Sequence, residues 1–230
     1  MKATTLLSIK TLALSAAGIG LISAAHANSI TIYSTGVNGS KAPLLDGTIG
    51  DLHYLLTSVP GGSTTNTRIR TSAGFWPIPP YIGDDSVSTW IGPNNNSQLY
   101  GPGGEYVYTT TFDLTGYNAS TASIAGRWAT DNTGLGISLN GGGLVSPIPY
   151  GPPYSFQDWT TFSLTSGFAS GLNTLEFHVY NGNDSNDTNG PTALRVEFTS
   201  ATVPDGGSTV ALLGFAVLGA ELLRRKLTHA

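Results

Sequence analysis

Histidine and cysteine, which often carry acid–base or nucleophilic chemistry, are scarce in this chain. The 230 residues include no cysteine and four histidines, and His26 and His229 lie near the two ends of the sequence. Thiol catalysis is therefore excluded. The sequence also contains no Gly-x-Ser-x-Gly elbow, His-Glu-x-x-His helix or phosphate loop. We expect a protein that is not an enzyme.

Charged residues still alternate with apolar ones along two predicted strands near the C-terminus. Glu176 and His178 alternate with Leu175, Phe177 and Val179, and Arg195 and Glu197 alternate with Leu194, Val196 and Phe198. We expect the four polar residues to form one cross-strand ion-pair patch on an outer face, because opposite charges are routinely paired across strands. An acid–base site is the less favoured interpretation.

Two loops combine proline with aromatic residues, at residues 75–81 and 147–154. Sugar rings stack on such side chains, and proline lowers the entropy cost of presenting them. The candidate glycan-binding residues are Trp76, Tyr81, Tyr150 and Tyr154. The interpretation that we favour is that these rings fold back over the ends of the domain, because large aromatic residues usually bury most of their surface.

A polar segment at residues 181–190 contains two carboxylates, Asp184 and Asp187. Its Asn, Asp, Ser and Gly content favours a plain turn. The alternative is a structural calcium site, although the segment does not match an EF-hand loop, whose last ligand position would fall on Arg195. We expect no other cofactor.

The elements that position these residues are predicted to be short β-strands. Aromatic and β-branched residues with turn signals between them indicate strands at 105–113, 120–129, 135–139, 159–164, 175–180 and 194–198, with weaker ones at 29–33 and 86–91. Asn140 and Gly141 form a strong hairpin signal. The pattern predicts an all-β fold, a β-sandwich of the jelly-roll type. Whether residues 28–100 belong to the same sandwich stays open.

Both ends of the chain have the composition of targeting signals. Residues 1–27 combine Lys2 and Lys10 with an apolar run and the small-x-small pattern that ends at Ala27, which predicts a helical signal peptide cleaved by signal peptidase after Ala27. At the other end, a Pro- and Gly-containing segment precedes an apolar run at 209–223 and a basic cluster. This order predicts a C-terminal transmembrane helix with its basic end in the cytoplasm. The predicted boundaries are 1–27, 28–202 and 203–230.

The C-terminal segment resembles the PEP-CTERM class of sorting tails, in the variant that begins Val-Pro-Asp. The residues that carry the resemblance are Val203, Pro204, Asp205, Gly206, Gly207, Arg224, Arg225 and Lys226. The resemblance implies a bacterial exported protein whose tail is processed by exosortase, a membrane-embedded protease-transpeptidase. Two positions depart from the pattern: Gly206 replaces the usual serine, and Glu221 lies in the apolar run. An ordinary membrane anchor without processing is the alternative.

The middle of the chain resembles the galactose-binding-like jelly rolls of secreted bacterial proteins. The resemblance is carried by residues 108–114, 126–132, 137–141, 167–168, 171–175 and 194–197. It implies a fold, and such folds bind sugars, act as scaffolding in enzymes or do neither.

Charge further limits the partners. Residues 28–202 contain five basic and twelve acidic side chains, a formal net charge of −7, which argues against nucleic acid because phosphate contacts need a basic patch. We therefore expect a non-catalytic exported protein, anchored in the cell envelope or released to the extracellular matrix. The alternative is a carbohydrate-binding module for surface polysaccharide.

Overall fold

The computed structural model describes residues 27–74, 79–183, 186–187, 189–204 and 224. The expected signal helix and transmembrane helix lie outside these residues. Within the described part of the chain, no helix has the length and apolar character needed to cross a membrane.

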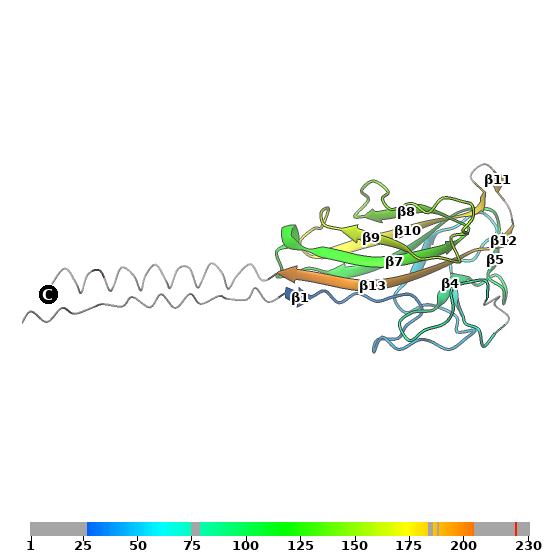
Figure 1. Cartoon of the computed structure of the whole chain (residues 1–230), viewed down its shortest axis with the longest axis horizontal. Coiled ribbons are helices and arrows are strands. Elements are labelled where there is room, and N and C mark those ends of the chain that lie inside the picture. The colour runs from blue at the N-terminus through cyan, green and yellow to red at the C-terminus, as the bar shows by residue number, and fades with distance from the viewer. Residues whose placement is uncertain (1–26, 75–78, 184–185, 188, 205–223, 225–230) are drawn as a thin grey trace, which may run out of the picture.

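Two β-sheets form the framework of the described chain (Figure 1). The six-stranded sheet has the order β3-β4-β13-β7-β9, with β1 also paired to β13. Its strands are β1 (Ala27–Ser29), β3 (Thr67–Arg70), β4 (Trp90–Pro93), β7 (Ser123–Asp131), β9 (Thr160–Leu164) and β13 (Ala193–Pro204). This sheet contains both the first described strand, β1, and the last, β13.

The five-stranded sheet has the order β11-β10-β6-β2, and β8 also pairs with β10, on the edge opposite β6. Its strands are β2 (Leu55–Ser58), β6 (Gly104–Asp113), β8 (Thr133–Leu139), β10 (Leu172–Asn183) and β11 (Asn186–Asp187). A separate short pair joins β5 (Tyr100–Gly101) to β12 (Gly190–Pro191), and a single 3-10 turn, η1, covers Ala119–Thr121. The predicted all-β class is confirmed, and the two sheets are not closed into a barrel.

The main core lies between the two sheets. Strand β10 shows why: Leu175, Phe177 and Val179 alternate along it and are all fully buried, as the period of two predicts. The ring of Phe177 lies 5.8 Å from that of Trp128 on β7, so the two sheets meet through aromatic contacts. The jelly-roll connectivity and the likeness to galactose-binding domains stay predictions.

The described residues between positions 27 and 100 contribute strands and core side chains to the same sandwich. Strand β2 pairs with β6, and β4 pairs with β13, so both sheets take strands from this part of the chain. Ile30, Tyr54, Ile69 and Ile91 are buried in the main core. The open question about residues 28–100 is thereby answered.

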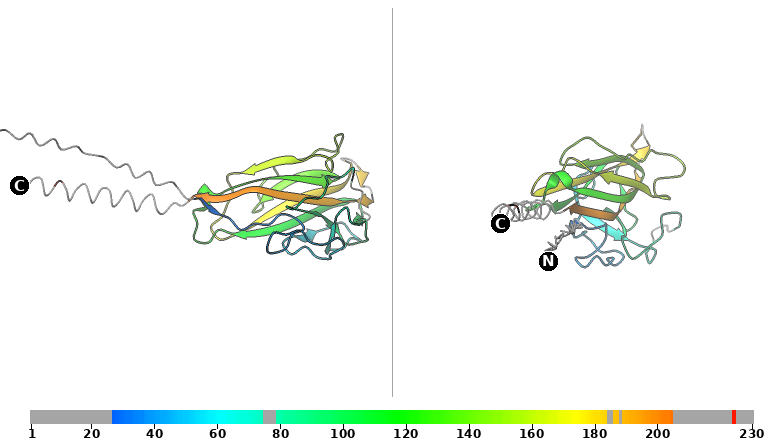
Figure 2. Two further views of the ribbon diagram at one scale, coloured as in Figure 1. Left: turned by 60° about the horizontal axis from the view of Figure 1, so that its bottom comes forward. Right: turned by 60° about the vertical axis from the view of Figure 1, so that its left-hand side comes forward.

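The first and last described strands run side by side at one end of the sandwich. Ala27, Asn28 and Ser29 pair with Pro204, Val203 and Thr202, respectively. Figure 2 shows β1 and the end of β13 at the same end of the domain. Whatever precedes Ala27 or follows Pro204 is thus joined to the same end of the domain.

Candidate functional site

The proline-aromatic loop between β8 and β9 is fixed at both of its ends. Ile148 is buried and exchanges two backbone hydrogen bonds with Gly134, at 2.7 and 2.9 Å. On the other side, the carbonyl of Ser155 accepts a hydrogen bond of 3.2 Å from the backbone N–H of Thr130. The tip between these anchors contains three prolines, whose locked φ angles limit its conformations.

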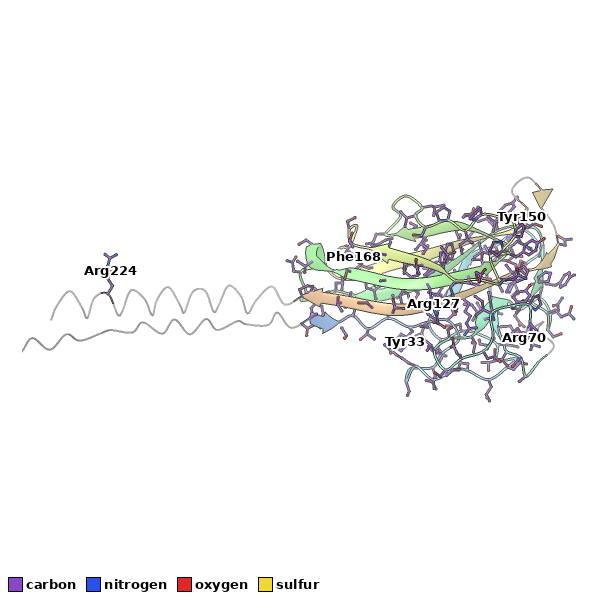
Figure 3. The ribbon with its side chains drawn as sticks, in the orientation of Figure 1. Tyr33, Arg70, Arg127, Tyr150, Phe168 and Arg224 are labelled. Atoms are coloured by element: carbon purple, nitrogen blue, oxygen red, sulfur yellow. The ribbon has the colours of Figure 1, made fainter. Side chains whose placement is uncertain are left out.

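Two tyrosines of this tip face solvent. Tyr150 is 43 % exposed and Tyr154 is 39 % exposed, and their ring centroids lie 6.1 Å apart. Tyr150 lies at the end of the sandwich remote from Ala27 and Pro204 (Figure 3). The sequence favoured rings that fold back over the domain, but these two keep a large exposed area.

The exposed rings belong to a row of aromatic side chains that extends into the interior. We call this row, which consists of Tyr150, Tyr154, Phe156, Tyr81 and Trp90, the aromatic ladder. Tyr154 stacks on Phe156 at 5.4 Å, Phe156 stacks on Tyr81 at 4.4 Å, and Tyr81 meets Trp90 edge-on at 5.4 Å. The ladder thus runs from the fully buried Trp90 to the exposed Tyr150. Such contacts restrain ring orientation, which lowers the entropy lost when a ligand binds.

A shallow depression of about 260 Å³ lies at the tip of the ladder. Its wall includes Pro149, Tyr150, Pro152, Pro153, Tyr154 and Asp158. Proline and tyrosine supply apolar faces, and the Asp158 carboxylate supplies a hydrogen-bond acceptor at the rim. This combination suits a ligand with one apolar face and several hydroxyl groups.

Tyr81 is buried, whereas a ring that binds a ligand would be exposed. It is 8 % exposed, and its hydroxyl donates a hydrogen bond to Oδ2 of Asp131. Tyr81 therefore supports the ladder from within the domain. Trp76, the fourth candidate, lies outside the described residues, so the structure brings together Tyr150 and Tyr154 only.

Asp131 is a buried carboxyl that sequence analysis did not single out. Burial raises its pKa to about 7, although the hydrogen bond from Tyr81 acts in the opposite direction. Its second oxygen accepts a hydrogen bond of 2.7 Å from the Asn132 side chain. No feature of the sequence marks this aspartate, because its contact with Tyr81 joins residues 50 positions apart.

The expected single patch of Glu176, His178, Arg195 and Glu197 is wrong. β10 carries the first pair and β13 carries the second, and these strands belong to different sheets. His178 contacts Glu105 at 2.6 Å on the five-stranded sheet. Arg195 and Glu197 instead lie in a separate buried cluster on the six-stranded sheet.

The cluster on the six-stranded sheet is closed by a loop and by Trp159. Arg195 is 0 % exposed, and it contacts Asp85 at 2.9 Å and the carbonyl of Gly83 at 2.6 Å. Glu197 contacts Arg127 at 2.6 Å, and the guanidinium groups of Arg127 and Arg195 lie 4.5 and 5.2 Å from the Trp159 ring. Burial lowers the pKa of Arg195, while Asp85 and Glu197 raise it. The charges are thus engaged with one another, which is the arrangement of a structural cluster.

The candidate calcium ligands cannot be joined into a site from the described residues. Asp184 lies outside them. Asp187 is part of β11, which pairs with β10 through Gly182 and Asn183, and its side chain is not described. Over the described segments, no group of three or more His, Asp or Glu side chains is placed to hold a metal ion. Calcium at this hairpin stays a prediction.

The sorting residues begin inside the folded domain. Val203 is 1 % exposed and belongs to the main core, and Pro204, the last residue of β13, is exposed. Arg224 is exposed as well. Asp205, Gly206, Gly207, Arg225 and Lys226 lie outside the described residues.

Comparisons with known proteins bear on this C-terminal segment alone. No curated protein and no solved structure matches the chain. Residues 202–227 match the sequence model of the VPDSG-CTERM motif. The chain therefore carries, at residues 202–227, a sorting motif of the PEP-CTERM type, in its VPDSG variant.

Proposed function

We propose that this protein is a non-catalytic component of the cell envelope or extracellular matrix. In this proposal it is exported through an N-terminal signal peptide and sorted by an exosortase-like membrane protease. The observation that carries the proposal is the VPDSG-CTERM match at residues 202–227, which begins at the end of β13. The structural or adhesive role is inferred from the lack of catalytic motifs in the sequence and from the exposed rings at the remote end of the sandwich.

The sorting function is tested by changing the motif and following the chain in its host. We expect the wild-type chain to be exported and converted to a shorter form, and we expect Asp205→Ala to slow this conversion about tenfold or more, as loss of one charged recognition contact would. The measurement is immunoblotting of cytoplasmic, membrane and external fractions over time. Asp113→Ala, at an exposed position on the domain surface, is the matched control and should leave conversion unchanged. Equal conversion of the Asp205→Ala and wild-type chains would contradict the proposal.

A second candidate function is carbohydrate binding, either as the protein's own activity or as its means of adhesion. The observation that favours it is the pair Tyr150 and Tyr154, which are exposed beside a proline-lined depression at the outer end of the aromatic ladder. Sugar rings present an apolar face of C–H groups that packs on such rings, with hydroxyl groups left for polar neighbours such as Asp158.

The binding test uses the full chain in detergent with soluble glucan, galactan and mannan as probes. We expect retention on one of these polysaccharides, and a loss of about five- to tenfold in affinity for Tyr150→Ala or Tyr154→Ala, since one stacking contact is worth about 1 kcal/mol or somewhat more. Tyr117→Ala is the matched control, because Tyr117 is 41 % exposed in a different loop, between β6 and η1. Repeating the titration with calcium and with a chelator tests the calcium alternative. Equal binding by the Tyr150, Tyr154 and Tyr117 variants would remove the aromatic ladder as the site.

A further inference from the structure

The sorting motif overlaps the folded domain by three residues. The match begins at residue 202, and β13 extends to Pro204, so Thr202, Val203 and Pro204 belong both to the motif and to the strand. Val203 is 1 % exposed and packs in the main core with residues of both sheets. The first part of the motif is therefore occupied by contacts with the domain itself.

Strand β1 covers the same residues along their backbone. Ala27, Asn28 and Ser29 pair with Pro204, Val203 and Thr202, and the next residue, Ile30, donates a 2.8 Å hydrogen bond to the carbonyl of Ala201. Hydrogen-bonded and non-hydrogen-bonded pairs alternate in an antiparallel ladder. Since Ile30 and Ala201 are hydrogen-bonded, Asn28 and Val203 form the next hydrogen-bonded pair, and Ser29 and Thr202 form a non-hydrogen-bonded pair between them.

The pairing continues beyond β1 and fixes the strand in place. The backbone N–H of Thr35 donates a 3.1 Å hydrogen bond to the carbonyl of Val196, and the Thr35 hydroxyl accepts a 3.0 Å bond from the N–H of Val196. Ile30 and Ile32 are buried in the main core, between these contacts. Residues 27–35 thus lie along β13 over most of its length.

A processing enzyme that binds the motif as an extended segment needs the side chain of Val203 and the backbone edge that β1 covers. We propose that strand β1 controls access to the sorting motif: the exosortase-like protease binds residues 202–204 only after the β1–β13 pair opens. This inference rests on the proposed sorting function, and it names the step that limits processing of the folded protein.

The expected signal-peptidase site lies on the same strand pair. Cleavage after Ala27 requires residues 27 and 28 to be free of β13, because both pair with motif residues in the folded domain. Removal of the signal peptide must then precede closure of the pair, and tail processing must follow its reopening. The closed β1–β13 pair therefore opposes both processing steps.

A disulfide across Ser29 and Thr202 tests the proposal. The chain has no cysteine, so a bond between Ser29→Cys and Thr202→Cys can form without competing thiols. Directly opposite residues of a non-hydrogen-bonded pair lie about 4.5 Å apart at Cα, within the range that a disulfide spans. The readout is conversion of the full chain to its processed form in the host, followed by immunoblot with and without added reductant. The controls are the two single-cysteine variants and the wild-type chain.

We expect the oxidised double variant to be processed at least about tenfold more slowly than the single-cysteine variants, with the rate recovered on reduction. Ile30→Ala, which loosens β1 without changing the motif, should speed processing. If the oxidised and reduced double variants are processed at the same rate while the wild type is processed normally, the access proposal is wrong and the sorting function stands. If the wild type is not processed at all, both fail together.

Discussion

At the scale of single residues, Asp131 is a carboxyl group whose burial is not indicated by its neighbours in the sequence. It lies at the end of β7, is almost completely buried, and accepts hydrogen bonds from Tyr81 and Asn132. Burial disfavours the charged form, and this effect exceeds that of the Tyr81 hydrogen bond, so the pKa of Asp131 is raised to about 7. Burial, followed by the charge and the hydrogen bond of Asp131, raises the pKa of Tyr81, so its hydroxyl stays protonated.

The raised pKa of Asp131 predicts that the protein is less stable at neutral than at mildly acidic pH. Between the unfolded value of 3.8 and the folded value of about 7, the folded state holds a proton that the unfolded state has lost, so stability falls as pH rises through this window. The full effect is on the order of 4 kcal/mol. Asp131→Asn should flatten this dependence, because an amide does not ionise; its oxygen can accept the Asn132 bond, and its NH2 group can donate to the Tyr81 hydroxyl oxygen. The measurement is the difference in the free energy of unfolding in urea between pH 5 and pH 8, for the wild type and for the variant.

Asp113→Asn is the control for that measurement. The Asp113 carboxylate accepts hydrogen bonds from the hydroxyl and backbone N–H of Thr115, which lower its pKa, so its contribution to stability is lost only below the ordinary range of an aspartate. This variant should keep the wild-type difference between pH 5 and pH 8. An Asp131→Asn protein with the same difference as the wild type would show that Asp131 does not titrate in this window.

At the scale of elements, the sequence predicts those strands whose signals are local. Alternating apolar residues marked β10, and aromatic and β-branched residues marked β6, and both lie where expected. Asn140 and Gly141 adopt positive φ angles of 53° and 72°, as the hairpin signal predicts. The segment after this turn forms only isolated bridges to β8, through Val145 and Ile148, because its prolines interrupt a regular strand.

The candidate site was less predictable, because it depends on which segments cover which sheet. Alternation correctly placed Arg195 and Glu197 away from the main core, but period two does not distinguish an open face from one covered by a loop. The loop that carries Asp85 and Ser88 lies about a hundred positions earlier in the sequence, so no local pattern reports its contact with Arg195. The same reasoning explains why Tyr81 and Tyr154 looked alike in sequence yet differ in exposure.

At the scale of the whole molecule, the sandwich has two unlike ends. One end carries the paired strands β1 and β13, where the predicted signal peptide would join the domain and where the sorting motif begins. The other end carries Tyr150 and its depression (Figure 3). If the tail holds the domain at the envelope, the rings of the ladder face away from the attachment point, which is where contact with a surrounding polysaccharide would occur.

This arrangement requires the chain from residue 27 onward to fold as one unit, which predicts that the C-terminal strands are not stable alone. Removal of residues 27–100 would delete six buried members of the main core: Ile30, Ile32, Tyr54, Leu56, Ile69 and Ile91. Each contributes about 1.5–3 kcal/mol by burial, so together they match or exceed the roughly 5–15 kcal/mol that stabilises a typical domain. We expect a chain that starts at residue 101 to lack a cooperative thermal transition and near-UV circular dichroism. The control is a chain that lacks residues 205–230, which keeps every one of these core contacts and should unfold in one sharp transition. Cooperative unfolding of the 101–230 fragment would contradict the prediction, because it would show that the early strands are an addition to a self-sufficient core.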